Sequence, residues 1–338
     1  MRAVLRSAGE RIEVVCSHRR LAGILEEGLA GHLAGADDSV PDVRVTVEKT
    51  SAPFDTAGWR VLTRDAWQRD GRVMVRNACS SGLDLMVTAN PLTLDILARW
   101  RPPVTGRAAA AVLRARSRLL IRAVLLQYPA LWWSQQRGRV PLHASVCALG
   151  PGGPTVLIAG PGGVGKSTLV NAELARGAQA TCDNLCVSDG RSAWGLLEPR
   201  RVTASDASAS ASGRRGRRMP HGRREAPWLN RVDELAPDLL LVLRRGDTAA
   251  PSVHACQPAD VARSLTAGTY MAGELRRYWA LAATLALGTG LGEIHPPIER
   301  VASRLSADLP CREIVLGDLP GVPLSGLLAA GTGAEART

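Results

Sequence analysis

The side chains best suited to chemistry lie in a glycine-rich stretch near the middle of the chain. Gly160, Gly165, Lys166 and Ser167 follow the spacing G-x-x-x-x-G-K-[ST], the Walker A pattern. Glycines at such a turn let backbone N–H groups point at phosphate oxygens, while the lysine reaches the outer phosphates and the hydroxyl binds Mg²⁺. The pattern predicts a site for ATP and Mg²⁺ that consists of Gly160, Pro161, Gly162, Gly163, Val164, Gly165, Lys166, Ser167 and Thr168.

A strand must deliver this loop and a helix must follow it. The apolar run Thr155–Ala159 predicts a buried strand, and a helix that begins near Lys166 would turn its positive N-terminal end toward the phosphates. The alternative is a chance turn in a glycine-rich protein. The chain has only two lysines, Lys49 and Lys166, among many arginines, so lysine at this position is not background composition.

Three polar residues are candidates for the rest of the site. Asp183 follows a predicted strand, where an acid beside the loop could bind Mg²⁺ or take the proton of an attacking hydroxyl; otherwise it is a turn or capping residue. Asn184 could add a neutral oxygen ligand for the metal. His143, near the start of an earlier strand, could support the reaction, although a lone histidine in an apolar strand can equally be a hydrogen-bonded core residue.

The segments LHAS (142–145), GPGGVGKST (160–168) and ARGAQATCDN (175–184) together resemble the C-terminal domain of HPr serine kinase/phosphorylase and its wider group of related kinases. The resemblance is close over these segments and looser over Arg137–Leu328. It implies a P-loop α/β domain akin to phosphoenolpyruvate carboxykinase, in which ATP phosphorylates a seryl hydroxyl of a small protein. By position it implies the family's strand histidine at His143, its cradle at Gly160–Thr168 and the first of its paired aspartates at Asp183.

The chain also departs from this family. Asn184 stands where the second aspartate would be, and Glu198-Pro199-Arg200-Arg201 only partly matches the family's Glu-Ile-Arg-Gly segment. The N-terminal third does not resemble that of the bacterial enzyme, and related kinases of this looser type act on ribosomally made peptides. The resemblance therefore implies a peptide or small protein, such as a ribosomal precursor peptide, as phosphoacceptor, and it points to a homo-oligomer such as a hexamer.

The composition is that of a globular and strongly basic protein. The chain has 338 residues, 46% of them hydrophobic, a formal net charge of +11 and a sequence pI of about 10.1. The basic excess is arginine in a chain rich in Ala, Gly and Pro, which GC-rich codons would produce. The chain also lacks the aromatic interleaving of a base-stacking platform. Both features argue against nucleic acid as the partner.

Cysteine usage and hydropathy indicate the compartment. The seven cysteines are scattered and odd in number, and the first residues, MRAVLRSAGERIEVV, lack the long apolar core of a secretory signal. We therefore expect reduced thiols in the cytoplasm. Cys182 and Cys186 have no second Cys or His pair nearby, which argues against a zinc site, and no apolar run is long enough to span a membrane.

The hydrophobic patterns divide the chain into three parts. We expect an α+β domain over residues 1–104 that could recognise substrate, a connecting helix over 105–136 within a helical run from Gly106 to Trp133, and the P-loop domain over 137–330. The fold class is then α/β, and the resemblance makes the last domain one of the HPr kinase and PEP carboxykinase-like type. The first part contains predicted helices over 19–33 and 90–100, and predicted strands over 11–16, 43–48, 60–63, 72–76 and 83–87.

The last part is expected to contain a strand over 237–243, helices over 258–266, 272–287 and 297–305, and a strand over 311–316. The predicted strand over 237–243 leads into Arg244, either a phosphate or base contact or a surface cation. The segment 203–224 has almost no apolar residue and predicts a mobile loop. Its arginines, Arg223 and Arg224 among them, either stay solvated or close over phosphates. Tyr270, Glu274, Arg276, Arg277 and Tyr278 either touch substrate or form an exposed face.

The combined interpretation is an ATP- and Mg²⁺-dependent kinase that phosphorylates a Ser or Thr hydroxyl of a peptide or small protein. Lys166 and the loop amides would hold the phosphates, Ser167 the metal, and Asp183 the acceptor hydroxyl, with His143 in support. Two alternatives remain at this point. One is a catalytically impaired P-loop ATP-binding protein that acts in maturation or regulation, since Asn184 replaces an acid; the other is a basic nucleic-acid-binding NTPase.

Overall fold

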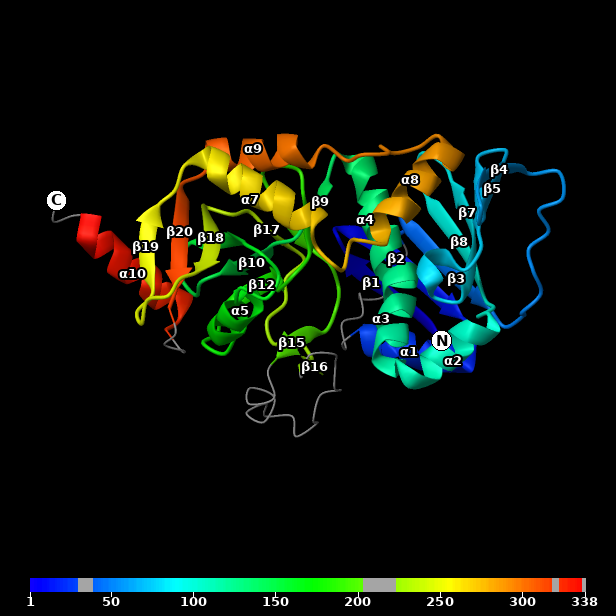
Figure 1. Ribbon diagram of the computed structural model, residues 1–338, viewed down its shortest axis with the longest axis horizontal. Coiled ribbons are helices and arrows are strands. Elements are labelled where there is room, and N and C mark those ends of the chain that lie inside the picture. The colour runs from blue at the N-terminus through cyan, green and yellow to red at the C-terminus, as the bar shows by residue number, and fades with distance from the viewer. Residues whose placement is uncertain (30–38, 203–222, 318–321, 336–338) are drawn as a thin grey trace.

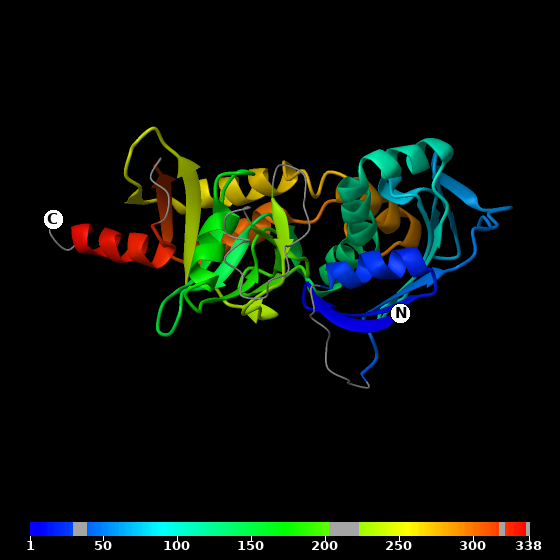
Figure 2. The same cartoon turned by 90° about the horizontal axis from the view of Figure 1, so that it is seen from below.

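Two β-sheets, one of eight strands and one of six, organise the chain into two lobes that lie side by side along its longest axis (Figure 1). In this computed structural model the described residues are 1–29, 39–202, 223–317 and 322–335. The N-terminus lies in the lobe of the eight-stranded sheet, and α10 (Leu324–Glu335) lies at the far end of the other lobe (Figure 2). The architecture is a mixed α/β fold with several sheets, so the structure agrees with the general α/β class that the sequence predicts.

The eight-stranded sheet has the order β1-β2-β3-β8-β7-β6-β5-β4. β2 and β8 run parallel to β3, and the other neighbours are antiparallel. β2, β3, β4, β6 and β7 confirm predicted strands, whereas the sequence patterns missed β1 and β5. The strands are β1 (Arg2–Ser7), β2 (Glu10–Cys16), β3 (Val43–Glu48), β4 (Arg60–Thr63), β5 (Ala66–Arg69), β6 (Arg72–Val75), β7 (Leu83–Ala89) and β8 (Leu94–Trp100).

The helix predicted over residues 90–100 is wrong, because this segment contains the strand β8. Leu94, Ile96 and Ala98 are buried, while the residues between them are more exposed. β8 pairs along its length with β3 on one side and with β7 on the other. The apolar residues therefore follow the two-residue period of a strand, and burial between two partners outweighs the preference of Pro91 for a helix start.

Helices cover one face of this sheet. The helical run predicted from Gly106 to Trp133 is present, but as separate segments rather than one helix. Leu113 has a non-helical φ of −102° and ψ of 51°, and Pro129, which lacks an N–H donor, follows a π-helical turn. The covering elements are α1 (Arg19–Gly28), α3 (Arg114–Arg122), the π-helical turn (Ala123–Gln127), α4 (Tyr128–Trp133) and α8 (Tyr278–Thr289). α2 (Val104–Val112) contacts α3, and short 3₁₀ turns lie at Ala78–Ser80 and Ser134–Arg137.

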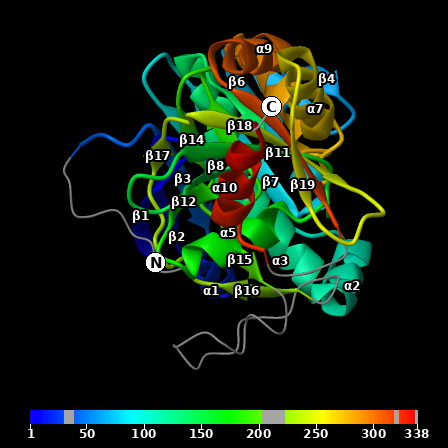
Figure 3. The same ribbon diagram turned by 90° about the vertical axis from the view of Figure 1, so that its left-hand side faces the viewer.

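The six-stranded sheet forms the middle layer of the second lobe, with the order β12-β10-β11-β18-β20-β19. β11, β18 and β20 are parallel to one another. Helices α5 and α10 pack on one face, and α7 and α9 pack on the other (Figure 3). The elements are β10 (Ser145–Ala148), β11 (Thr155–Ala159), α5 (Lys166–Leu174), β12 (Gln179–Cys182), β18 (Leu239–Arg245), β19 (Ser252–Ala255), α7 (Pro258–Tyr270), α9 (Ile298–Asp308) and β20 (Cys311–Leu316).

A buried cluster joins the two lobes. Leu185, Val187, Trp194 and Leu196 pack in the same hydrophobic core as the strands of the eight-stranded sheet. The backbone N–H of Ala8, in the first lobe, also donates to the carbonyl oxygen of Gly195, in the segment that contains these four residues, at 3.0 Å. The segment belongs to a four-stranded sheet of β9 (Val140–Leu142), β13 (Cys186–Ser188), β14 (Ala193–Gly195) and β17 (Glu234–Leu235), and a two-stranded sheet of β15 (Arg200–Val202) and β16 (Arg224–Ala226) lies beside it.

Further expectations concern one helix, a mobile loop, a membrane span and the cysteines. The helix predicted over 272–287 begins later, at Tyr278, because residues 272–277 form turns. The mobile loop predicted over 203–224 falls mainly on residues 203–222, which lie outside the described residues. Within the described ranges, no helix is both long and apolar enough to cross a membrane. All seven cysteines are free thiols.

Candidate functional site

The glycine-rich loop connects β11 to α5, as the Walker A pattern requires. Gly160, Gly163 and Gly165 have φ of 146°, 81° and 127°, a region that residues with a side chain rarely adopt. Pro161, Gly162 and Gly163 are exposed, so the tip of the loop is open to solvent. The first N–H groups of α5 lack partners within the helix and point toward the loop. The loop thus presents backbone donors to any anion that binds there.

Two glycines of this loop differ in what a side chain would meet. A Cβ on Gly160 would lie 2.9 Å from the Leu243 carbonyl oxygen on the neighbouring strand β18, and its φ is left-handed. We expect Gly160→Ala to destabilise the fold by about 1–3 kcal/mol. Gly162→Ala is the matched control, since a Cβ there has no neighbour within 4 Å. Urea unfolding measures both variants, and equal losses of stability in the two would contradict this interpretation.

Lys166 is buried, and its ammonium bonds to the loop itself. Nζ donates to the carbonyl oxygens of Gly160 at 2.7 Å and Pro161 at 3.2 Å. Burial lowers the pKa of Lys166 to about 8, against the opposing negative charges of Glu274 and Asp183. The side chain is therefore still mainly charged at neutral pH. A phosphate group could replace the two carbonyls as its partner.

Asp183 directly follows β12 and lies against the start of α5. Its backbone carbonyl accepts hydrogen bonds from Ser167 Oγ at 3.0 Å and Ser145 Oγ at 2.6 Å. Its carboxylate Oδ2 accepts from the Arg201 backbone N–H at 3.3 Å, whereas Oδ1 is buried without a hydrogen-bond partner among the described residues. Burial raises the pKa of Asp183, and the positive charge of Arg201 opposes that rise. Buried acceptors are rarely left unpaired, so Oδ1 is a place for a hydroxyl or a cation.

The donor set near Ser167 fits a magnesium ion that is shared with phosphates. Mg²⁺ prefers oxygen ligands and is commonly held by one or two carboxylates together with substrate phosphates. The Ser167 hydroxyl and the unpaired Asp183 Oδ1 are such oxygens. Among the described residues there is no group of three or more His, Cys, Asp or Glu side chains that could bind a metal on its own. A metal held by these two oxygens would take its other ligands from nucleotide phosphates and water.

His143 and Asn184 form a chain of hydrogen bonds that ends at Glu274. His143 Nε2 lies 3.2 Å from Asn184 Oδ1, and Asn184 Nδ2 donates to Glu274 Oε1 at 3.4 Å. Burial, together with the charge of Lys166, lowers the pKa of His143, which favours the neutral ring. A neutral ring would carry its proton on Nε2, facing the amide oxygen. Since His143 occupies Asn184 Oδ1, the expected magnesium role of Asn184 would require this bond to break.

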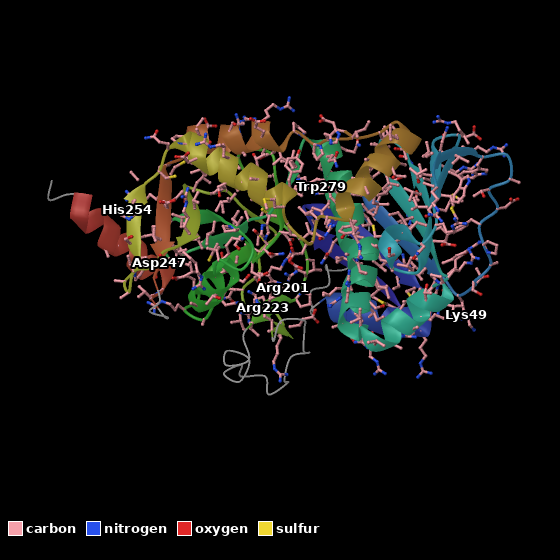
Figure 4. All side chains as sticks on the ribbon, viewed as in Figure 1. Lys49, Arg201, Arg223, Asp247, His254 and Trp279 are labelled. Atoms are coloured by element: carbon pink, nitrogen blue, oxygen red, sulfur yellow. The ribbon has the colours of Figure 1, made fainter. Side chains whose placement is uncertain are left out.

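Arg201 links the acid to a further group of charges. Its guanidinium donates to Glu274 Oε1 at 2.6 Å and to Glu198 Oε2 at 3.3 Å, while its backbone N–H holds Asp183. Figure 4 shows Arg201, a residue of β15, near the middle of the molecule. Burial alone would raise the pKa of Glu274, but the charge and hydrogen bond of Arg201 outweigh it and lower that pKa to about 2. Arg201 and Glu274 therefore form a stable ion pair next to Asp183.

Glu198 has the opposite shift and gives a testable pH dependence. Burial raises its pKa from 4.5 to about 7, although Arg201 opposes the rise. The folded state then holds the proton that the unfolded chain loses above about pH 4.5, so stability falls as pH rises from 4.5 to 7. We expect Glu198→Gln to remove this pH dependence, which changes the free energy of unfolding by a few kcal/mol at most.

Urea unfolding at pH 5 and pH 8 would measure the difference between the wild type and Glu198→Gln. Glu299→Gln, at an exposed position in α9, is the control and should follow the wild type. If all three proteins change in parallel between the two pH values, the raised pKa of Glu198 is excluded.

Sequence reasoning found part of this arrangement. The structure brings together His143, Asp183, Asn184 and the loop from Gly160 to Thr168, although their roles remain predictions. In the sequence, Arg201 and Glu198 form only a partial match to a family segment, and Glu274 belongs to a group that either touches substrate or forms an exposed face. No local pattern marks Glu274, since its contacts are made across the fold. Arg244 is an exposed partner of Glu313 at 2.5 Å, which favours the surface alternative.

Comparisons with protein families and with curated protein sequences find no match. Among solved structures, the HPr(Ser) kinase/phosphatase from Coxiella burnetii is similar with a TM-score of 0.23 and 18% sequence identity. The similarity covers 35% of this chain and 77% of that one. A likeness of this degree establishes neither a shared fold nor a shared activity.

Proposed function

We propose that this chain is an ATP- and Mg²⁺-dependent kinase that phosphorylates a Ser or Thr hydroxyl of a peptide or small protein. The main support is the position of Asp183. Its carbonyl bonds to Ser167 at the start of α5, and its carboxylate Oδ1 is buried without a partner among the described residues. An acid held beside an open loop of backbone donors is the arrangement that phosphoryl transfer to a hydroxyl requires.

In this proposal the loop and Lys166 bind the phosphates of ATP. The N–H groups at the start of α5 and around Gly162 and Gly163 donate to phosphate oxygens, and Lys166 Nζ exchanges its carbonyl partners for phosphate oxygens. Mg²⁺, which Ser167 and Asp183 would hold, supplies positive charge that neutralises the phosphate oxygens. Because the transition state of phosphoryl transfer is loose, positioning and charge neutralisation supply most of the rate.

Asp183 would position the acceptor and receive its proton. The acceptor oxygen bonds to the γ-phosphorus, the bond from that phosphorus to the β–γ bridging oxygen breaks, and ADP departs. The hydroxyl proton passes to the Asp183 carboxylate. Burial raises the pKa of Asp183, which makes the carboxylate a better proton acceptor than an exposed aspartate.

His143, Asn184 and Glu274 would act by positioning. Their hydrogen bonds connect Asn184, the neighbour of Asp183, to the Arg201–Glu274 ion pair. A neutral His143 adds no positive charge beside Lys166, so the ammonium remains the main cation at the loop. The sequence-based expectations of a cytoplasmic location and a homo-oligomer are part of the same proposal.

The direct test is transfer of label from γ-labelled ATP. The full chain, Mg²⁺ and a set of Ser- and Thr-containing peptides should give labelled phosphoserine or phosphothreonine, and omission of Mg²⁺ should abolish the product. Binding of a fluorescent ATP analogue should be measured in parallel. Nucleotide binding without transfer to any hydroxyl would contradict the kinase proposal.

One observation favours a second candidate, a catalytically impaired ATP-binding protein that acts in maturation or regulation. Position 184 carries an amide, and that amide is committed to His143 and Glu274 rather than free for a metal. Such a protein would bind ATP and change shape without transferring phosphate. The parallel binding measurement separates it from the kinase.

A further inference from the structure

A large groove opens between the two lobes and reaches the candidate site. It has a volume of about 1060 Å³ and is lined by residues of the β4–β5 region, of α3 and the π-helical turn, and of the segment from Gly273 to Thr284. Glu198, Arg201 and Glu274 also line it. The groove therefore connects residues of the N-terminal sheet to the ion-pair cluster that holds Asp183. Its volume is slightly above the range of about 300–1,000 Å³ that is typical of small-molecule pockets.

Arg201 lies between the groove and Asp183. Arg201 lines the groove, and its backbone N–H donates to Asp183 Oδ2 at 3.3 Å. A chain that lies in the groove against Arg201 is thus one residue away from the buried carboxylate. Glu198, Arg201 and Glu274, which surround Asp183, contribute to the wall of the groove.

The charges of the groove are not balanced. Arg76 pairs with Asp65 at 2.5 Å, and Arg201 pairs with Glu274 and Glu198. Three more arginines line the groove, Arg116 on α3 and Arg276 and Arg277 before α8, and none of them forms an ion pair with another residue within the described ranges. Arg116 and Arg276 are exposed and Arg277 is half-buried. An occupant that carries carboxylates would complete these charges.

The groove also offers apolar surface. Leu119 and Leu120 of α3 are half-buried, and Ala123 continues the same wall. A wall that is apolar on one side and lined by arginines elsewhere suits a polypeptide better than a small anion, because both side-chain types find partners. Nucleic acid would use the arginines, but few aromatic side chains are available for its bases, since Tyr128 is buried.

We propose that this groove binds the phosphoacceptor as an acidic peptide segment, with its hydroxyl at the Arg201 end and Asp or Glu side chains against Arg116, Arg276 and Arg277. This inference rests on the proposed kinase function and adds the chemical class of the acceptor. It also assigns a task to the N-terminal lobe, which supplies one wall of the groove. Specificity then comes from residues outside the phosphate loop.

The test uses the full chain and two synthetic serine peptides of equal length, one rich in Asp and Glu and one in which lysines replace those acids. The groove variant carries Arg116→Glu, Arg276→Glu and Arg277→Glu. The matched control is Arg300→Glu, an exposed arginine of α9 that does not line the groove. Fluorescence anisotropy measures peptide binding, and γ-labelled ATP measures transfer.

We expect the wild type and Arg300→Glu to prefer the acidic peptide in both assays. The groove variant should bind that peptide at least about tenfold more weakly, with KM for the peptide raised by a similar factor, while the affinity for the nucleotide stays unchanged. It should also prefer the lysine peptide. Circular dichroism and nucleotide binding check that the variant is folded. The single Arg276→Glu variant should lose less affinity for the acidic peptide than the groove variant does.

The two proposals fail in different ways. Transfer with no dependence on peptide charge or on the groove arginines would overturn the groove and leave the kinase in place. Binding of the acidic peptide through the groove without any transfer would overturn the kinase and leave the groove. Loss of oligo-dT binding in the groove variant, with peptide binding unchanged, would identify nucleic acid as the occupant and overturn the peptide proposal.

Discussion

Replacing Asp183 with asparagine is expected to lower phosphoryl transfer by about 10²–10⁴-fold while nucleotide binding is retained. The amide cannot receive the acceptor proton as the carboxylate can. The change preserves shape, and an amide oxygen can still accept the Arg201 N–H that now bonds to Oδ2 at 3.3 Å. Burial raises the pKa of Asp183, so removal of its charge should not unfold the protein.

Single-turnover transfer from γ-labelled ATP and titration with a fluorescent ATP analogue measure the two quantities separately. Asp70→Asn, at the exposed turn between β5 and β6, is the control and should behave as the wild type. Nearly full transfer by Asp183→Asn would exclude the proposed role of this carboxylate. Loss of nucleotide binding together with transfer would indicate that Asp183 acts mainly through the metal.

Lys166→Ala is expected to reduce transfer by about 10²–10³-fold and to weaken nucleotide binding as well. Its ammonium is the only lysine cation near the loop, and it lies close enough to bond to the carbonyls of Gly160 and Pro161. The fold should survive, because removing a buried ammonium also removes its desolvation cost. Lys49→Ala provides the control, since Lys49 is exposed and is the only other lysine of the chain.

The same side chain predicts the alkaline limb of the pH profile. Because burial lowers the pKa of Lys166 to about 8, the free protein loses this charge as pH rises through 8. kcat/KM for ATP should fall there, and Lys166→Arg should move the fall to higher pH because arginine stays protonated. An alkaline limb at the same pH in both proteins would assign it to another group.

The local patterns predicted the elements that carry the loop. β11 and α5 follow from an apolar run and a Walker A turn, and the strand before Asp183 is also predicted, all from short segments. The left-handed φ of Gly163 and Gly165 could also be anticipated, because the turn requires it. These features depend on neighbours in sequence, so a single sequence is sufficient to predict them.

The remainder depends on contacts between distant segments. Glu274 lies 73 residues from Arg201 along the chain, and their ion pair exists only because the segment before α8 returns to the first lobe. The helix predicted over 90–100 failed for the same reason, since burial of β8 between β3 and β7 decides its conformation. The groove is built from segments that are far apart in sequence, and no local pattern could reveal it.

The cluster of Leu185, Val187, Trp194 and Leu196 with the N-terminal strands has a mechanical consequence. If the lobes rotated about a hinge, this apolar surface would be exposed to water, at a cost of about 25 cal/mol for each Å². The chain crosses between the lobes more than once, because α8 packs on the first sheet after the second lobe has begun. We therefore expect the packing between the lobes to keep the width of the groove nearly constant, so that a bound peptide would have to fit that width.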